Sequence, residues 1–270
     1  MQIPESHRWA TGRGVRVAVI DTGSDTRHPD LRERITGTRN FVDRDADTFN
    51  GDIHGTAVTG VIAAVSNNGA GLVGVAPEAD ILSLKACWQR GNTASDAICS
   101  SFTLAKALNF AIDQQVDVIN LSLGGPADPL LQRLVNKALE QNILVVGAAT
   151  PKFPGGFPVG IDGVIGVANM DAQQQQNRLV NAPGNQVLST SPDNQYDFFT
   201  GSSFSAAQVS GVSALIRQRK PHLPAKIVKD LLATTSQPNH GAANACRAVA
   251  RVVESDGCEP PRTISHATDL

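Results

Sequence analysis

An aspartate, a histidine and a serine, three residue types that together catalyse acyl transfer, each lie where a regular element is predicted to begin or end. Asp21 follows a run of apolar residues, while His54 and Ser203 each open a stretch of small and apolar residues. Serine is a poor nucleophile until a base removes its proton, and histidine can act as that base near neutral pH. A buried carboxylate then fixes the histidine tautomer and stabilises the imidazolium. The sequence therefore predicts a catalytic triad of Asp21, His54 and Ser203.

Each of these residues also has an ordinary structural interpretation when it is considered alone. Gly-Ser-Ser sequences are common in turns and helix caps, and a lone histidine or turn aspartate is more often structural than catalytic. Two features favour catalysis at Ser203. Gly201 permits a tight turn before it, and the predicted helix N-terminus offers unpaired N–H groups and the positive end of the helix dipole to a developing negative charge.

The elements that would position these residues alternate between strands and helices. A β-branched run over residues 15–20 predicts a buried strand that leads into Asp21, and open α/β sheets place functional groups at such carboxyl ends. We predict further strands over residues 79–85, 116–123, 143–149, 164–168 and 186–189, and helices over residues 54–64, 101–114, 129–141, 203–220 and 224–234. This alternation predicts an α/β fold of three layers, with a mostly parallel central sheet and helices on both faces.

The composition is that of a soluble globular protein. The 270 residues are 41% hydrophobic and 18% charged, which suits one large domain or two small ones. The formal net charge of −2 gives no basic surface for nucleic acid, and no apolar run approaches the roughly 20 residues that cross a bilayer. The first residues are not a signal peptide, and we expect the chain to be cut from a longer precursor. We predict a domain over residues 1–253 and a polar, proline-bearing tail over residues 254–270.

Four cysteines form two sets, Cys87 with Cys99 and Cys246 with Cys258, each with its members twelve positions apart. Four cysteines allow three pairings, and the sequence alone does not choose among them. We favour the local pairing, in which each bond closes one loop, over four reduced thiols in a cytosolic protein. This choice favours a secreted or periplasmic location over a cytoplasmic one. The cysteine and histidine spacings do not indicate a zinc site.

The order of these residues and the segments around them resemble the subtilisin-like serine protease family, the subtilases. The matching segments are residues 18–23 (AVIDTG), 28–31 (HPDL), 54–56 (HGT), 74–77 (GVAP), 120–126 (NLSLGGP), 182–184 (APG), 201–203 (GSS) and 244–248 (NACRA). The resemblance extends over roughly residues 10–250. It implies a subtilisin-like fold and a serine endopeptidase in which Ser203 is the nucleophile, His54 the general base and acid, and Asp21 the residue that orients His54. It implies no cofactor for the chemistry.

The resemblance also implies how a peptide or protein substrate binds. Subtilases bind extended peptides as an added strand, through backbone hydrogen bonds. The matching segment here is Leu123, Gly124 and Gly125, where glycine lets a substrate backbone come close. Gly156 would lie at the floor of the pocket for the residue before the cleaved bond, and it would leave room for a large apolar side chain. A pro-segment or an inhibitor is a further partner that the resemblance implies.

The main departure from the family pattern is at the oxyanion hole. After a predicted strand the family usually has Gly-Asn, whereas this chain has Thr150-Pro151-Lys152. Pro151 stands in place of the asparagine whose amide stabilises the tetrahedral intermediate, and proline has neither a side-chain donor nor an N–H. Loss of one such donor typically lowers turnover by about 100- to 1,000-fold, which predicts a slow enzyme. Thr150, Lys152 or a neighbouring loop would supply the missing donor, and proximity favours Thr150.

A structural calcium ion is a second property that the resemblance implies. Family members often hold calcium with an aspartate after the His-Pro pair and an asparagine after the histidine helix, and Asp30 and Asn68 match these positions. Hard oxygen ligands suit Ca²⁺, and backbone carbonyl groups near Ala70 and Leu72 would complete the set. The alternative is that Asp30 is hydrogen-bonded locally and binds no metal.

These residues leave more than one function open. The leading hypothesis is a serine endopeptidase that forms an acyl-enzyme. A second is a protease-like protein that binds peptides with negligible turnover, which Pro151 alone favours. A third is a narrow processing protease or a peptide ligase, in which an amine captures the acyl-enzyme. The same triad serves hydrolysis and ligation, so the sequence does not separate them.

Overall fold

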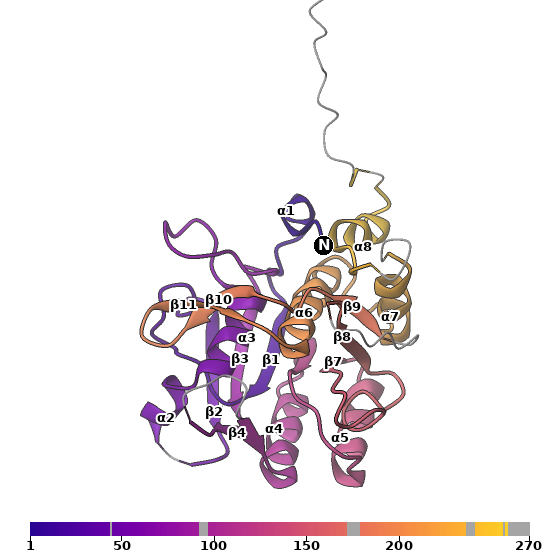
Figure 1. Ribbon diagram of the computed structural model, residues 1–270. Coiled ribbons are helices and arrows are strands. Elements are labelled where there is room, and N and C mark those ends of the chain that lie inside the picture. The colour runs from indigo at the N-terminus through magenta and orange to yellow at the C-terminus, as the bar shows by residue number, and fades with distance from the viewer. Residues whose placement is uncertain (44, 92–96, 172–178, 236–240, 256, 259–270) are drawn as a thin grey trace, which may run out of the picture.

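The computed structural model describes residues 1–258 apart from 44, 92–96, 172–178, 236–240 and 256 (Figure 1). A parallel sheet of seven strands forms its centre. These strands are β1 (Arg16–Asp21), β2 (Ile35–Asn40), β3 (Asp80–Lys85), β6 (Val118–Leu121), β7 (Leu144–Ala148), β8 (Ile165–Asn169) and β9 (Val180–Ala182). Hydrogen bonds link them in the order β2-β3-β1-β6-β7-β8-β9, so the strand that ends at Asp21 lies inside the sheet.

The apolar residues of β1 form a strand that is buried on both faces. Val17 and Val19 contribute to the core on one side of the sheet, and Ala18 and Ile20 to the core on the other side. Successive side chains point to opposite faces of a strand, so a continuous apolar run is what a strand covered on both faces requires. Asp21 is the first charged residue after this run, at the carboxyl end of the strand.

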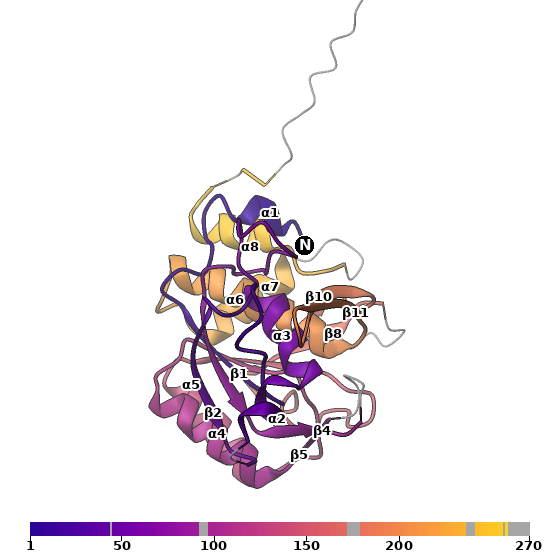
Figure 2. The ribbon, with the colours of Figure 1, turned by 90° about the vertical axis from the view of Figure 1, so that its left-hand side faces the viewer.

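Helices cover both faces of the sheet (Figure 2). They are α1 (Ile3–Ser6), α2 (Ala46–Asn50), α3 (Ile53–Ala63), α4 (Ser101–Asp113), α5 (Pro129–Glu140), α6 (Ser202–Arg219), α7 (Ala225–Thr234) and α8 (Ala245–Val252). The core on one face contains residues of α3, α6, α7 and α8, and the core on the other contains residues of α4 and α5. The predicted three-layer α/β fold is therefore confirmed. Within the described ranges, no helix combines the length and apolar character of a membrane span.

Two antiparallel hairpins accompany the central sheet. One joins β4 (Cys87–Gln89) to β5 (Ala97–Cys99), and the other joins β10 (Val187–Ser191) to β11 (Gln195–Phe199). The strand predicted over residues 186–189 is β10, but it pairs with β11 and not with the parallel sheet. An apolar pattern identifies a strand without specifying its partner, which explains why the sequence did not reveal this pairing.

Both local disulfides that the sequence interpretation favoured are present. Cys87 bonds to Cys99 across the β4–β5 hairpin, where the two residues also stand opposite each other in the strand register. Cys246 of α8 bonds to Cys258. The second bond fixes the end of the described chain to a helix of the domain.

The two ends of the described chain lie together, with α1 beside α8 in both views (Figure 1). The Ala245 N–H donates to the Met1 carbonyl at 2.8 Å, and the Asn244 amide donates to Gln2 at 2.7 Å. Gln2 in turn donates to the carbonyl of Cys258 at 3.3 Å. The predicted tail is therefore in contact with the domain at Cys258, and its residues 259–270 lie outside the described residues.

Candidate active site

Asp21 and His54 form a buried hydrogen-bonded pair. Asp21 ends β1 and His54 lies in the first turn of α3, and Nδ1 of His54 lies 2.6 Å from Oδ1 of Asp21. The backbone N–H of Thr22 donates to the same oxygen at 2.7 Å. The second oxygen of Asp21, Oδ2, is buried and accepts no hydrogen bond from a described residue. The carboxylate is therefore held on one side by two donors, which fixes the orientation of the imidazole.

A glycine allows α3 to come this close to the end of β1. A Cβ atom added at Gly55 would lie 1.9 Å from the carbonyl oxygen of Gly23. Any larger residue would push the first turn of the helix away from the strand, and His54 would move with it. The Gly55 N–H also donates to Thr22 Oγ1 at 3.1 Å. The glycine of the His-Gly-Thr segment is therefore needed for close packing of the helix against the strand.

The surroundings of His54 raise its pKa. Burial alone would lower this pKa, since it disfavours the charged form of the ring. The charge and hydrogen bond of Asp21, together with the charge of Asp52, outweigh burial. The imidazolium that forms when His54 accepts a proton is therefore stabilised by two carboxylates.

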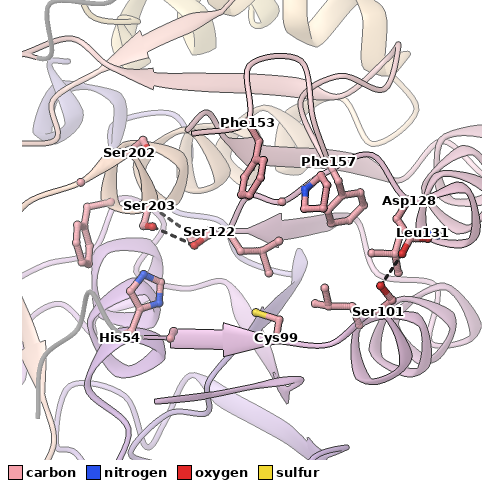
Figure 3. Close-up of a pocket in the computed structure, with 18 of the residues that line it drawn as sticks. His54, Cys99, Ser101, Ser122, Asp128, Leu131, Phe153, Phe157, Ser202 and Ser203 are labelled. Carbon is pink, nitrogen blue, oxygen red and sulfur yellow. Dashed lines mark hydrogen bonds between the residues drawn. The ribbon is translucent and has the colours of Figure 1, made fainter. Parts of the chain in front are cut away.

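Ser203 lies at the start of α6, after a glycine in a conformation that other residues rarely adopt. Gly201 has a φ of +152°, and the helix follows directly. The Ser203 hydroxyl donates to the carbonyl oxygen of Ser122 at 3.0 Å, and the Ser122 hydroxyl donates back to the Ser203 carbonyl at 2.8 Å. Figure 3 shows His54 facing Ser203. No hydrogen bond joins these two described residues, and catalytic hydrogen bonds are often long or poorly aligned until a substrate binds.

His54 and Ser203 line a cavity of about 680 Å³. Leu123, Gly124 and Gly125, the residues predicted to bind the substrate, form part of its wall. On the side away from His54, Figure 3 shows Ser101, Asp128 and Leu131 beyond Phe157, and Leu104 also lines the cavity.

Gly156 does not line this cavity. It lines an adjacent space of about 50 Å³, and a Cβ atom added to it would lie 2.2 Å from the carbonyl oxygen of Gly125. The Gly125 N–H also donates to the Phe157 carbonyl at 2.9 Å, so the two backbone segments are in direct contact. The structure brings Gly125 and Gly156 together, and it leaves little open space where the sequence interpretation places a large apolar side chain.

The segment that follows β7 offers one uncommitted hydroxyl. Thr150 Oγ1 accepts the backbone N–H of Lys152 at 3.3 Å, and its hydrogen has no acceptor among the described residues. The Thr150 methyl group faces Gly124, where an added Cβ atom would lie 2.5 Å from it. The Ser202 hydroxyl, by contrast, donates to the Ala149 carbonyl at 2.7 Å. With respect to the described residues, Thr150 therefore has a free donor and Ser202 does not, although Thr150 is not one of the residues that line the main cavity.

The surroundings of Asp30 do not fit a calcium ion. The Asn68 amide donates to one Asp30 oxygen at 2.6 Å, and the Tyr196 hydroxyl and the Leu72 N–H donate to the other at 3.0 and 3.3 Å. Donors thus face the carboxylate on the side where a cation would have to lie. Burial, followed by the hydrogen bond and charge of Asp30, raises the pKa of Tyr196 to about 12. No cluster of three or more histidine, cysteine, aspartate or glutamate side chains suited to a metal occurs in the described ranges.

Two charged residues next to the site received no role from the sequence. Lys85 is buried at the end of β3, and its Nζ contacts the carboxylate of Asp52, two residues before His54. A lysine that directly follows the mostly apolar run Ile81–Leu84 is a signal that the sequence did contain. Ser122, which exchanges hydrogen bonds with Ser203, lies in a motif that was recognised without a role for the residue itself.

A sequence model of the subtilase family matches residues 12–249, which include Asp21, His54 and Ser203. The chain belongs to the subtilase family. This subtilase is a subtilisin-like serine protease, and thus a hydrolase. The resemblance predicted from the motifs is confirmed.

Relatives of this subtilase carry protease names. It is 37% identical over 270 residues to an intracellular serine protease of Paenibacillus polymyxa, covering 88% of this chain and 80% of the relative. It is 38% identical over 235 residues to the major intracellular serine protease of Bacillus subtilis (strain 168), covering 77% of this chain and 71% of the relative. A solved protease structure from Pseudoalteromonas arctica matches with a TM-score of 0.78 at 27% identity, covering 93% of this chain and 94% of that one.

Proposed function

We propose that this subtilase is an endopeptidase that cleaves peptide bonds through an acyl-enzyme, with Ser203 as nucleophile, His54 as base and Asp21 as its orienting carboxylate. The observation that carries the proposal is the 2.6 Å Asp21–His54 hydrogen bond beside a cavity that Ser203 also lines. His54 Nε2 takes the Ser203 proton while Oγ attacks the carbonyl carbon. The C–N bond then breaks, and the same proton passes to the leaving amine. Water attacks the ester in the second half, with His54 again acting as base.

The substrate would lie in extended form along Leu123, Gly124 and Gly125. This segment runs from the end of β6 and forms the cavity wall next to Ser203. A peptide backbone can pair with such a segment as an added strand. The main cavity would receive side chains upstream of the cleaved bond. A pro-segment or an inhibitor with the same extended backbone would compete for this wall.

For the oxyanion we propose two donors, the backbone N–H of Ser203 and the hydroxyl of Thr150. The N–H of Ser203 belongs to the first turn of α6, where helices leave their N–H groups without partners inside the helix. We expect Thr150→Val, which keeps the shape of the side chain, to lower kcat by about 100-fold or more with little change in KM. Thr150→Ser should retain activity. Equal kcat values for the valine variant and the unchanged enzyme would assign the donor to another group.

The experiment that tests the proposal is labelling with a fluorophosphonate, compared with Ser203→Ala. We expect the unchanged protein to label and the alanine variant not to label, because only an activated serine reacts. The peptide-binding alternative, which Pro151 favours, predicts that neither protein labels while both bind an extended peptide. Hydrolysis and ligation are then separated by product analysis with and without an added amine acceptor.

We propose one peptidase domain over residues 1–253, a tail over residues 254–270, and a secreted or periplasmic location. Two disulfides support this location, because such bonds persist in oxidising compartments. The names of two relatives describe those proteins as intracellular, which is the opposite location, so the redox state of the cysteines is the property to measure. Thiol titration of protein taken from its own cells should find no free thiol if the location is oxidising, and four if it is reducing.

A further inference from the structure

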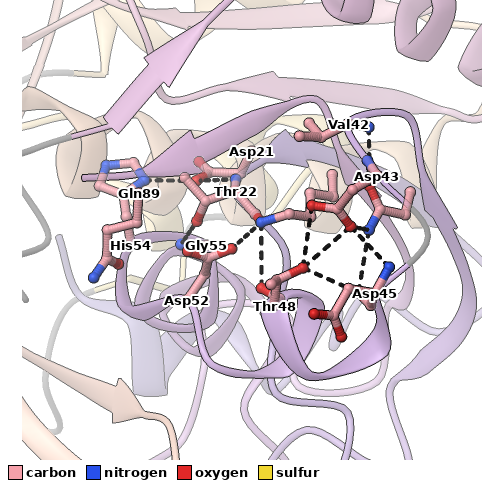
Figure 4. A network of polar contacts seen from close by, with 12 residues as sticks. Asp21, Thr22, Val42, Asp43, Asp45, Thr48, Asp52, His54, Gly55 and Gln89 are labelled. Atoms are coloured by element: carbon pink, nitrogen blue, oxygen red, sulfur yellow. Dashed lines mark hydrogen bonds and ion pairs between the residues drawn. The ribbon is translucent and has the colours of Figure 1, made fainter. Parts of the chain in front are cut away.

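A lysine is buried directly behind the Asp21–His54 pair. Lys85 ends β3, is 1% exposed, and stands beside Asp21 in the register of the two neighbouring strands. Its ammonium group donates to the Thr22 carbonyl at 2.5 Å, to the Thr48 carbonyl at 3.2 Å and to the carboxylate of Asp52. Figure 4 shows Thr22, Thr48 and Asp52 converging in this way. Every N–H of the ammonium group therefore has an acceptor.

These acceptors come from the two segments that carry the proposed base and its orienting carboxylate. Thr22 follows Asp21 at the end of β1, and Asp52 precedes His54 by two residues at the start of α3. A buried ammonium group is costly unless its donors are satisfied, so it holds its acceptors close. Lys85 thus connects the Thr22 carbonyl, next to Asp21, to the Asp52 carboxylate, close to His54.

Asp52 makes this contact in place of a helix cap. It occupies the N-cap position of α3, where aspartate usually accepts a hydrogen bond from the first helical turn, but its side chain makes no such bond. The N–H of Ile53 is satisfied by the Gln89 side chain at 2.8 Å. The carboxylate of Asp52 is therefore directed to Lys85 and not to its own helix.

The charge of Lys85 also affects the pKa of Asp52, and the charge of Asp52 affects the pKa of His54. Burial raises the pKa of Asp52, and the hydrogen bond and charge of Lys85 oppose this effect. The charged groups around His54 are Asp21 from β1 and Asp52 from the start of α3, with Lys85 of β3 behind these two carboxylates. The hydroxyl of Ser203 and the apolar ring of Phe204, both from α6, also face the imidazole. The negative charge of Asp52 is one of the effects that raise the pKa of His54.

We propose that Lys85 and Asp52 are positioning residues of this protease, whose ion pair fixes the end of β1 against the start of α3 and so holds His54 on Asp21. The proposal rests on the catalytic roles proposed for Asp21 and His54. Lys85 does not line the substrate cavity, so it acts through those two residues. Loss of the ion pair should misplace His54, and displacements of about 1 Å can lower turnover by about 100-fold.

The first test measures the pKa of His54 by NMR titration in Ser203→Ala protein, which needs no turnover. Asp52→Asn keeps an oxygen for Lys85 and a similar shape but removes the negative charge. We expect the pKa of His54 to fall, and the acid limb of kcat/KM in the active enzyme to move to lower pH with it. The matched control is Glu78→Gln, which breaks the Arg13–Glu78 pair near the other end of β1 and should leave the pKa unchanged. An unchanged pKa in Asp52→Asn would overturn the proposal.

The second test removes the connection without leaving a lone buried charge, in the double variant Lys85→Met with Asp52→Asn. We expect kcat to fall by about 10- to 100-fold with KM unchanged, in a protein that still unfolds cooperatively. A double variant with the kcat of the unchanged enzyme would overturn the positioning role. If the double variant does not fold, the Asp52→Asn titration decides alone. Fluorophosphonate labelling of the unchanged enzyme separates these outcomes from failure of the proposed function, in which that enzyme would not label.

Discussion

His54 lies between two carboxylates and an apolar ring, and this arrangement decides both its tautomer and its proton affinity. Asp21 contacts Nδ1 at 2.6 Å, which leaves Nε2 free for the proton transfer that we propose from Ser203. The Phe204 ring lies 5.7 Å from the imidazole ring, centroid to centroid, and limits its movement on the other side. A single residue thus receives its orientation from a hydrogen bond, its proton affinity from charge, and its confinement from an aromatic neighbour.

We expect kcat/KM to decline on the acid side with a pKa above the ordinary histidine value of about 6.5. Burial, the largest influence, lowers the pKa of His54, but Asp21 and Asp52 together raise it further than burial lowers it. A base works only when it is unprotonated, so a raised pKa moves the acid limb to higher pH. The measurement is a pH–rate profile with a peptide substrate. A limb below pH 6 would contradict the charge balance described for His54.

At the scale of elements, a capping signal in the sequence marks the start of some predicted helices but not of others, such as α3 and α6. The helix predicted over residues 101–114 is α4, which begins at a capping box in which the Ser100 and Thr103 side chains each accept the backbone N–H of the other. β2 was missed because its residues alternate between partly buried and exposed, without an apolar run. The contact between Gly156 and the Gly125 carbonyl could not be foreseen either, since only the folded chain brings these two segments together.

A prediction for the elements concerns Asp30, which joins the loop after α3 to the β10–β11 hairpin through hydrogen bonds. The Tyr196 hydroxyl of β11 donates to the Asp30 carboxylate at 3.0 Å. We expect Tyr196→Phe to lower the free energy of unfolding by about 1–3 kcal/mol, because it leaves a buried carboxylate oxygen with one donor fewer. Since the pKa of Tyr196 is raised to about 12, this difference should be constant up to about pH 10 and disappear above pH 12.

The matched measurement is thermal unfolding with and without a chelator. Excess EDTA should leave the melting temperature of the unchanged protein where it is, since donors and not a cation satisfy Asp30. A lower melting temperature in EDTA, restored by added calcium, would show instead that Tyr196 gives way to the ion.

At the scale of the whole molecule, the two disulfides have different relations to the site. Cys246–Cys258 joins α8 to the end of the described chain, and neither cysteine lines the cavity, whereas Cys99 of the other bond does. We expect the double variant Cys246→Ser with Cys258→Ser to lose about 2–4 kcal/mol of unfolding free energy at unchanged kcat/KM. The matched variant of Cys87 and Cys99 should lose both stability and kcat/KM. Urea unfolding and peptide hydrolysis measure the two effects.

The overall architecture was predictable because the sheet alternates with helices along most of the chain, and because Asp21, His54 and Ser203 each lie at an element boundary. The contacts that connect the segments carrying Asp21 and His54 were not predictable. The Lys85 contacts with Thr22 and Asp52 depend on the neighbouring positions of β1 and β3, which are separated by more than fifty residues in the chain and meet only in the sheet.

The order of the elements along the chain has a consequence for synthesis. All seven strands of the central sheet, ending with β9 at Ala182, precede α6 and its serine. A chain that emerges from the ribosome amino end first can therefore assemble its sheet, with the proposed base and its carboxylate in place, while it still lacks the proposed nucleophile. α3 already lies on one face of that sheet, but the apolar surface that α6 covers on the same face stays exposed until α6 docks, so a truncated chain would be partly apolar on that face and chemically inert. The growing polypeptide is thus protected from its own activity by the position of one serine late in the reading frame.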